Sequence, residues 1–424
     1  MTANATGSHA WRALRHPNFR LFFFGQSISV IGTWLTQVAR GWLVYELTHS
    51  ALLLGVVSFV GQIVSFVMGP FGGVWVERLD RRKLMIYTQA INALQSLFLA
   101  VVTLMHVVTL WQIIALTVVA GVVGALAVPA RLSFVAVMVE DRNDIDNGVA
   151  LLTSMNNIAR LVGPAIAGLV IAAWGEGWCF LIDAVSFLPV IVSLALMRMS
   201  PPENRHRPQG MLEEIREGWS YVSSFLPIRV LLMFVALVSL MGNSHAVLLP
   251  IFASSVLHGG PTTLGWLTSA SGIGALMSTF LLALRKSVVG LARVVQLAGA
   301  LLGLALILFG FSHVLWLSLL LMVLIGFGLM QSVTGVNTII QSLVPEDMRG
   351  RIMSYYAMAF LGAAPFGNLL ASALAERLGT PAAVVLTGAA CFASSIWLAL
   401  QLPRVIGAMR PIYAQKGLLD STRR

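Results

Sequence analysis

The chain has 424 residues, of which 58% are hydrophobic and only 10% are charged. Soluble globular proteins carry about 25% charged residues, so this chain has too few ionisable side chains to cover a water-facing surface. Because a helix needs roughly 20 apolar residues to cross a bilayer, the composition excludes a soluble protein. It indicates an all-α protein that crosses the membrane many times.

Cysteine usage and net charge narrow the function classes further. The two cysteines, Cys179 and Cys391, lie in apolar runs, which excludes a disulfide framework and a metal site built from cysteine. The N-terminus lacks the apolar segment and cleavage site of a removed signal peptide. The net charge of +10 fits basic loops against anionic lipid, so we expect membrane lipids rather than nucleic acid as partners.

Long apolar stretches predict twelve membrane spans. The predicted spans are 19–44, 51–76, 84–105, 110–137, 148–174, 178–198, 228–253, 262–284, 290–312, 314–341, 352–376 and 380–402. A hydrophilic linker, 199–227, divides them six and six, and 211–224 within it predicts an amphipathic helix. We therefore expect an N-terminal bundle over 1–198, a C-terminal bundle over 228–402 and a tail over 403–424.

The basic residues predict the orientation of the chain. Of the 27 Lys and Arg residues, 23 lie in or next to the termini, the linker and every second connection, all on one side. Arg377 alone lies on the other side, and Arg40, Arg131 and Arg160 lie within spans. Since basic loops stay inside, we expect a protein of the cell membrane with both termini in the cytoplasm.

The two halves share sequence features in the same order. Leu54-Gly55 at the start of span 2 matches Leu264-Gly265 at the start of span 8. Gly163-Pro164 in span 5 matches Ala364-Pro365 in span 11. Matches on equivalent spans predict a duplicated six-helix unit, with the two copies related by a parallel repeat.

The turn between spans 2 and 3 reads Gly-Val-Trp-Val-Glu-Arg-Leu-Asp-Arg-Arg-Lys over 73–83. It is similar to the Gly-x-x-x-Asp-Arg-x-Gly-Arg-Arg/Lys signature of the major facilitator superfamily, with Glu77 for the aspartate and Asp80 for the second glycine. The segments 42–48, 129–131, 159–164 and 344–351 are similar to the branch of drug:proton antiporters that includes enterobactin exporters and macrolide efflux proteins.

This resemblance implies a fold of two pseudo-symmetric six-helix bundles and a cytoplasmic gate in the turn. The gate residues it implies are Gly73, Glu77, Arg78, Asp80, Arg81 and Arg82. Glu77 would face the start of span 11 near Arg351 while the inner side is closed. The alternative is that the basic residues only anchor the turn against anionic lipid. In span 5, the family's helix-packing motif keeps Gly163, Pro164 and Gly168, and alanines replace its other glycines.

Polar side chains within the spans are candidates for a substrate cavity, because lipid cannot satisfy them. The resemblance implies that spans 1, 4, 7 and 10 line this cavity. The candidates are Gln26, Thr33, Gln37, Arg131, Asn156, Arg160, Asn243, Gln331, Thr334, Asn337, Thr338 and Gln341. The alternatives are hydrogen bonds between helices and, for the arginines, snorkelling to the membrane surface.

Proton coupling requires a group that gains and loses a proton between two states. Asp183 is the one acid clearly within a span, Glu46 lies at the outer end of span 1, and Arg40 lies at a similar depth. We expect Asp183 or Glu46 to bind and release a proton as it loses and gains its contact with Arg40, with His245 as the next candidate. A static ion pair is the alternative.

Catalytic and metal-binding motifs are absent from the sequence, so we expect no enzyme, no catalytic residue, no metal and no cofactor. Without a nucleotide-binding loop, uphill transport has to use an ion gradient. The sequence therefore predicts a monomeric secondary transporter that exports a small amphipathic or hydrophobic compound against protons. An importer or a flippase for a lipid-like solute is the alternative, followed by a membrane protein that transports nothing.

Overall fold

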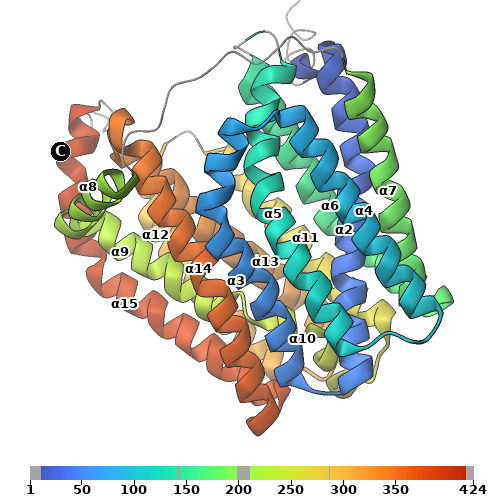
Figure 1. Cartoon of the computed structure of the whole chain (residues 1–424). Coiled ribbons are helices and arrows are strands. Elements are labelled where there is room, and N and C mark those ends of the chain that lie inside the picture. The colour runs from blue at the N-terminus through green and yellow to red at the C-terminus, as the bar shows by residue number, and fades with distance from the viewer. Residues whose placement is uncertain (1–10, 140, 142–143, 198–210, 286, 417–424) are drawn as a thin grey trace, which may run out of the picture. The chain divides into compact units, whose positions relative to one another are not determined.

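The computed structural model describes residues 11–139, 141, 144–197, 211–285 and 287–416 (Figure 1). Within these residues the regular elements are helices. Twelve helical segments are long and apolar enough to cross a membrane, as the sequence predicts. The protein is therefore an all-α, multi-pass membrane protein.

The first half contains six long helices after a short 3₁₀ turn, η1 (Arg12–Arg15). They are α2 (Pro17–Thr48), α3 (Ala51–Arg78), α4 (Arg81–Leu104), α5 (Leu110–Met138), α6 (Ile145–Trp174) and α7 (Glu176–Leu196). The linker helix α8 (Met211–Ser224) has the bounds that the sequence predicts. The linker residues before it, 199–210, lie outside the described residues.

The second half begins with a span of four pieces: α9 (Leu226–Leu237), η3 (Val238–Gly242), α10 (His245–Ile251) and η4 (Phe252–Val256). The remaining helices are α11 (Pro261–Ala283), α12 (Leu291–Gly310), α13 (Leu315–Leu343), α14 (Glu346–Leu378) and α15 (Thr380–Gln415). Helix α15 continues into the residues that we expected to form a tail. It does so although Pro403 and Pro411 lie inside it.

Helix ends at equivalent places in the two halves have the same backbone geometry. Gly175 ends α6 and precedes α7 with φ +89°, and Gly379 ends α14 and precedes α15 with φ +86°. A side chain is strained at such angles, so glycine is the favoured residue at both breaks. This shared turn agrees with the predicted repeat.

The chain divides into two compact units whose bounds differ from those of the predicted bundles. Unit 1 comprises Met1–His49, Val60–Arg205 and Gly259–Ser269, and unit 2 comprises Ser50–Phe59, His206–His258 and Ala270–Arg424. The first turns of α3 thus belong with α14, and the first turns of α11 belong with α6. Hydrophobic periodicity does not reveal this exchange, because it depends on contacts between helices far apart in sequence.

Both exchanges rest on close helix contacts. In unit 2, the Asn368 amide donates to Ser58 Oγ over 2.9 Å, and the rings of Phe59 and Phe366 lie 5.5 Å apart. In unit 1, Ser269 Oγ donates to the Leu161 carbonyl over 2.7 Å. Hydrogen bonds and small residues replace the hydrophobic effect as the main source of helix association in a membrane.

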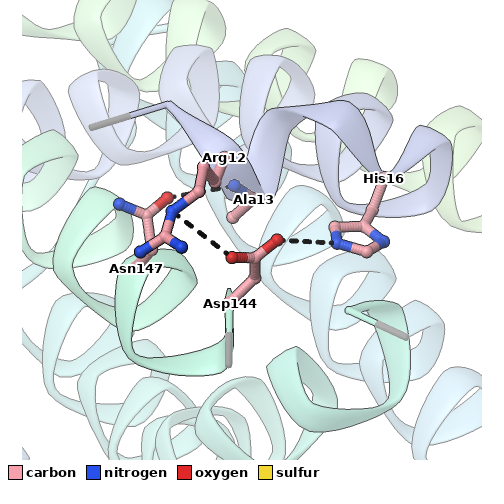
Figure 2. Close-up of polar contacts among 5 residues, drawn as sticks. All are labelled: Arg12, Ala13, His16, Asp144 and Asn147. Carbon is pink, nitrogen blue, oxygen red and sulfur yellow. Dashed lines mark hydrogen bonds and ion pairs between the residues drawn. The ribbon is translucent and has the colours of Figure 1, made fainter. Parts of the chain in front are cut away.

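The basic turns and termini mark one end of each unit, which we call its basic end. At the basic end of unit 1, the turn η1 is tied to the start of α6 (Figure 2). Asp144 accepts from His16 Nε2 at 3.4 Å and pairs with Arg12 Nε at 3.6 Å. The Ala13 amide donates to Asn147 Oδ1 over 3.0 Å. These contacts fix where α2 begins.

Candidate functional site

The predicted gate turn lies at the basic end of unit 1, and three of its residues have structural contacts. Asp80 caps α4 by accepting from the amides of Arg82 and Lys83 at 2.9 and 3.2 Å. The Arg82 guanidinium donates to the carbonyls of Leu194 and Ala195, each over 2.7 Å, and so caps α7. These contacts hold α4 and α7 together at the membrane surface.

Of the remaining gate candidates, Arg81 also has a structural contact, whereas Gly73, Glu77 and Arg78 are only partly described. Arg81 donates to the Ser133 carbonyl over 3.4 Å. Gly73, Glu77 and Arg78 belong to α3 by their backbone, but the side chains of Glu77 and Arg78 and the burial of Gly73 are not described. In unit 2, Arg351 at the start of α14 forms an ion pair with Glu217 of the linker helix α8. That acid is a partner of Arg351 which sequence reasoning did not suggest.

Asp183 of α7 lies at the centre of a buried polar cluster in unit 1. Only 2% of the residue is exposed. Its Oδ2 accepts from the hydroxyls of Thr36 on α2 and Ser96 on α4, over 2.9 and 2.7 Å. Arg40 of α2 acts on it electrostatically, while its Oδ1 has no hydrogen-bond partner among the described residues. The cluster joins three helices and combines an acid with a base.

Two acids, Glu46 and Glu176, lie at the end of unit 1 opposite to its basic end. Glu46 near the end of α2 is exposed, and its carboxyl group is hydrogen-bonded to that of Glu176, the first residue of α7. The sequence placed Glu176 in a loop, so this partner was missed. The sequence could have suggested this partner, because Glu46 at the end of span 1 and Glu176 just before span 6 are expected on the same side of the membrane.

His245 in unit 2 is the first residue of α10, shortly after the π turn η3, and is buried, with 3% of the residue exposed. Its Nδ1 lies 2.8 Å from the Gly242 carbonyl of the preceding turn. Asn243 beside it is half-buried. The imidazole therefore has a partner within its own span, as a structural histidine would.

Two cavity candidates on α6, Asn156 and Arg160, meet the indole ring of Trp34 on α2 in unit 1. Trp34 Nε1 donates to Asn156 Oδ1 over 3.3 Å, and the guanidinium carbon of Arg160 lies 5.9 Å from the centre of the Trp34 ring. Gly163 allows this contact, because a Cβ there would lie 2.5 Å from Trp34 Cβ. We call Trp34, Asn156 and Arg160 the Trp34 cluster.

The other candidates of unit 1 differ in exposure. Thr33 and Gln37 are exposed on α2 beside Trp34. Gln26 is buried instead and accepts from the Gln89 amide over 3.2 Å, so it joins α2 to α4. The Nε of Arg131 on α5 is buried, and none of the described residues offers it a hydrogen bond.

The candidates on α13 of unit 2 largely bond to each other and to neighbouring helices. Gln331 is buried and accepts from Ser278 over 2.8 Å. Gln341 donates to Asn337 over 2.7 Å, and Thr338 donates to the Thr334 carbonyl over 3.0 Å. Gln331 therefore fits the alternative of a hydrogen bond between helices best.

The packing motif of α6 lies against the first turns of α11 within unit 1. A Cβ at Gly168 would lie 2.8 Å from the Pro261 carbonyl and 3.2 Å from the Gly265 Cα. The backbones approach so closely that a larger residue at Gly168 would force them apart. Pro164 of the same motif is buried within α6. Gly163 and Gly168 thus face different helices.

Comparison with known proteins identifies the family. The model of the transmembrane secretion effector family, a branch of the major facilitator superfamily, matches residues 8–412. The chain belongs to this family. Among the residues described, no group of three or more His, Cys, Asp or Glu side chains is placed to hold a metal ion.

Relatives of the chain include proteins named as transporters. It is 24% identical to the staphyloferrin A transporter of Staphylococcus aureus over 366 residues, 85% of this chain and 90% of that protein. It is 27% identical to the multidrug efflux pump Tap of Mycolicibacterium fortuitum over 369 residues, 85% of this chain and 89% of the pump. Both the family and these relatives confirm the predicted resemblance to efflux-type members of the superfamily.

A solved structure confirms the fold of this family member. A bacterial homologue of the human lysosomal transporter Spinster shares 13% sequence identity with it and superposes with a TM-score of 0.67. The match covers 96% of this chain and 99% of the other. At such identity the likeness shows the twelve-helix fold alone.

Proposed function

We propose that the chain exports a small amphipathic compound across the cell membrane, driven by protons that move inward, with both termini in the cytoplasm. A relative named as a multidrug efflux pump supports export, and a relative named as a staphyloferrin A transporter supports transport of a small compound. The basic ends of the two units support the orientation. The observation that supports proton coupling is the buried Asp183 cluster.

The groups around Asp183 oppose each other in their effect on its charge. Burial disfavours the carboxylate, whereas the Thr36 and Ser96 hydroxyls and the charge of Arg40 favour it. Because Thr36 and Arg40 belong to α2 and Asp183 belongs to α7, a shift between these helices changes the balance. The carboxylate then takes up a proton in one state and releases it in the other.

Helix α2 is well placed to transmit such a shift. A Cβ at Gly32 would lie 2.8 Å from Asp183 Oδ1, so the backbone of α2 passes directly beside the carboxylate. The same helix carries Trp34 and the exposed Thr33 and Gln37 on the turns that follow. A solute that binds these side chains therefore acts on the helix that sets the proton affinity of Asp183, as alternating access requires.

The proposal is tested in inside-out vesicles that contain the purified protein and an imposed proton gradient, acidic inside. Ethidium, rhodamine 6G and fluorescein serve as amphipathic probes. We expect the wild type to accumulate at least one of them and to release protons as it does so. Asp183→Asn should reduce uphill accumulation at least tenfold and retain exchange of the same probe down its gradient.

Asp146→Asn is the matched control, because it makes the same chemical change at an exposed acid at the start of α6. It should transport like the wild type. Normal uphill accumulation by Asp183→Asn, with unchanged pH dependence, would refute the role of this carboxylate. Accumulation that occurs only in right-side-out vesicles would show uptake instead of export.

A further inference from the structure

The Trp34 cluster lies halfway along both of its helices. Arg160 is about 22 Å from the start of α6 and Trp34 about 26 Å from the start of α2, at 1.5 Å per residue. These helices have 30 and 32 residues, so both positions fall near the middle of a membrane span. A charge at that depth is costly unless a protein group or a ligand offsets it.

No acid offsets the charge of Arg160 among the described residues. Arg160 is in none of the ion pairs of the described residues, and no carboxylate among them acts electrostatically on its guanidinium. Arg40 of α2, by contrast, has Asp183 nearby. Among the described residues, the guanidinium of Arg160 instead lies over the face of Trp34, which stabilises a cation less than a carboxylate would.

The polar atoms that the cluster offers to a ligand are mainly donors. Arginine has only donors. The Asn156 carbonyl oxygen already accepts from Trp34, which leaves its amide nitrogen to donate. A guanidinium stacked on an indole ring also keeps its edge available for two parallel hydrogen bonds to one carboxylate. This set of donors suits an anion and repels a cation.

The residues around these donors are exposed and add a weaker set of acceptors. Thr33 and Thr153 lie exposed on α2 and α6. Their hydroxyls donate to the carbonyls of Ser29 and Val149 over 3.0 and 2.9 Å, so their oxygens are left to accept. A hydroxyl or amide N–H on the solute would match them.

We infer that the Trp34 cluster is the binding site for the anionic group of the exported solute, an amphipathic compound that bears a carboxylate beside a planar apolar part. The inference rests on the proposed export function and adds the charge of the substrate. Arg160 and Asn156 bind the carboxylate, and Trp34 positions the guanidinium and contacts the apolar part. The solute thereby supplies the negative charge that the described residues lack.

The test compares two probes of the same shape that differ in charge. 1-Naphthaleneacetate is an anion, and 1-naphthaleneacetamide is its neutral counterpart. Binding of each is measured by titration calorimetry on the full chain in nanodiscs of zwitterionic lipid, with empty nanodiscs as the blank. We expect the acetate to bind at least tenfold more tightly than the acetamide.

Two variants of Arg160 make the test specific. Arg160→Gln should abolish the preference for the acetate, and Arg160→Lys should retain a weaker preference, because it keeps the charge but not the planar fork. Arg293→Gln, the same change at an exposed arginine at the start of α12, should bind like the wild type. The lysine variant also covers the case in which Arg160→Gln does not fold.

The outcomes separate this inference from the proposed function. Equal binding of the two probes by the wild type, or a full preference that persists in Arg160→Gln, would overturn the anion site, even if proton-driven export of a dye is observed. A preference that depends on Arg160 supports the site even where vesicles show no proton-driven export. In that second case the export proposal fails and the binding site stands.

Discussion

Arg40 and Arg160 both lie within membrane-spanning helices of unit 1, but different groups surround them. Arg40 stands near Asp183, which also accepts two hydroxyl hydrogen bonds and is buried between α2, α4 and α7. Arg160 stands over an indole ring beside exposed polar side chains, with no acid near it in the part of the chain that the structure describes. The protein thus offsets one intramembrane charge internally and leaves the other available.

These two arrangements of an intramembrane arginine would allow one unit to bind two kinds of ligand. A charge pair inside the protein changes its protonation when its helices move, because each partner sets the charge of the other. A charge without a partner instead gains free energy when an anion arrives. On this view the Asp183 cluster binds and releases protons, the Trp34 cluster binds the solute, and α2 contributes residues to both.

The largest expected effect concerns the orientation of unit 1, which decides the side of the membrane that is nearer to the Asp183 cluster. Val107 follows α4 at the end opposite to the basic end, Leu79 lies in the basic turn, and both are exposed. In a chain whose Cys179 and Cys391 are replaced by alanine, Val107→Cys should react completely with an impermeant maleimide added to whole cells. Leu79→Cys should react only after permeabilisation, and the reverse pattern would place the Asp183 cluster near the cytoplasm.

The second effect concerns stability. Arg40→Gln leaves the buried Asp183 without its charge partner and should lower the free energy of unfolding by roughly 3 kcal/mol. Arg160→Gln removes a charge that has no acid partner and should leave stability unchanged or raise it. Both are measured by thermal unfolding of the purified protein in one detergent.

A double variant provides the control for this prediction. Arg40→Gln combined with Asp183→Asn removes both charges of the pair, so it should recover most of the stability that Arg40→Gln loses. Equal destabilisation by Arg40→Gln and Arg160→Gln would contradict the comparison. It would mean that Arg160 also has a stabilising partner.

Sequence reasoning predicted the elements of this fold better than its contacts. Composition and periodicity predicted the twelve spans and the bounds of α8, because both are local properties of the chain. They did not predict the association of the first turns of α3 with α14, which depends on contacts such as that between Ser58 and Asn368. They also ended the last span before Pro403, although helix α15 continues through it.

The site shows the same division. Arg160 and Asp183 stand out in the sequence because charges are rare in apolar spans. Their partners do not: Ser96 and Trp34 are ordinary residues of membrane helices, and only the packing of α4 and α6 against α7 and α2 gives them a role. Hydrogen bonds between helices connect residues far apart in the sequence, such as Thr36 and Asp183, which are 147 positions apart, and no local pattern encodes them.

The smallest expected effect concerns the indole nitrogen of Trp34, which holds Asn156 in the orientation that the anion site requires. Trp34→Phe keeps an aromatic face for Arg160 but removes the hydrogen bond to Asn156 Oδ1. A neutral hydrogen bond contributes about 0.5–1.5 kcal/mol, so binding of 1-naphthaleneacetate should weaken between twofold and tenfold. The preference for the acetate over the acetamide should persist, because Arg160 keeps its charge. Titration of both probes checks this, and complete loss of the preference in Trp34→Phe would show that the indole N–H and its bond to Asn156, rather than the charge of Arg160, determine the selectivity for anions.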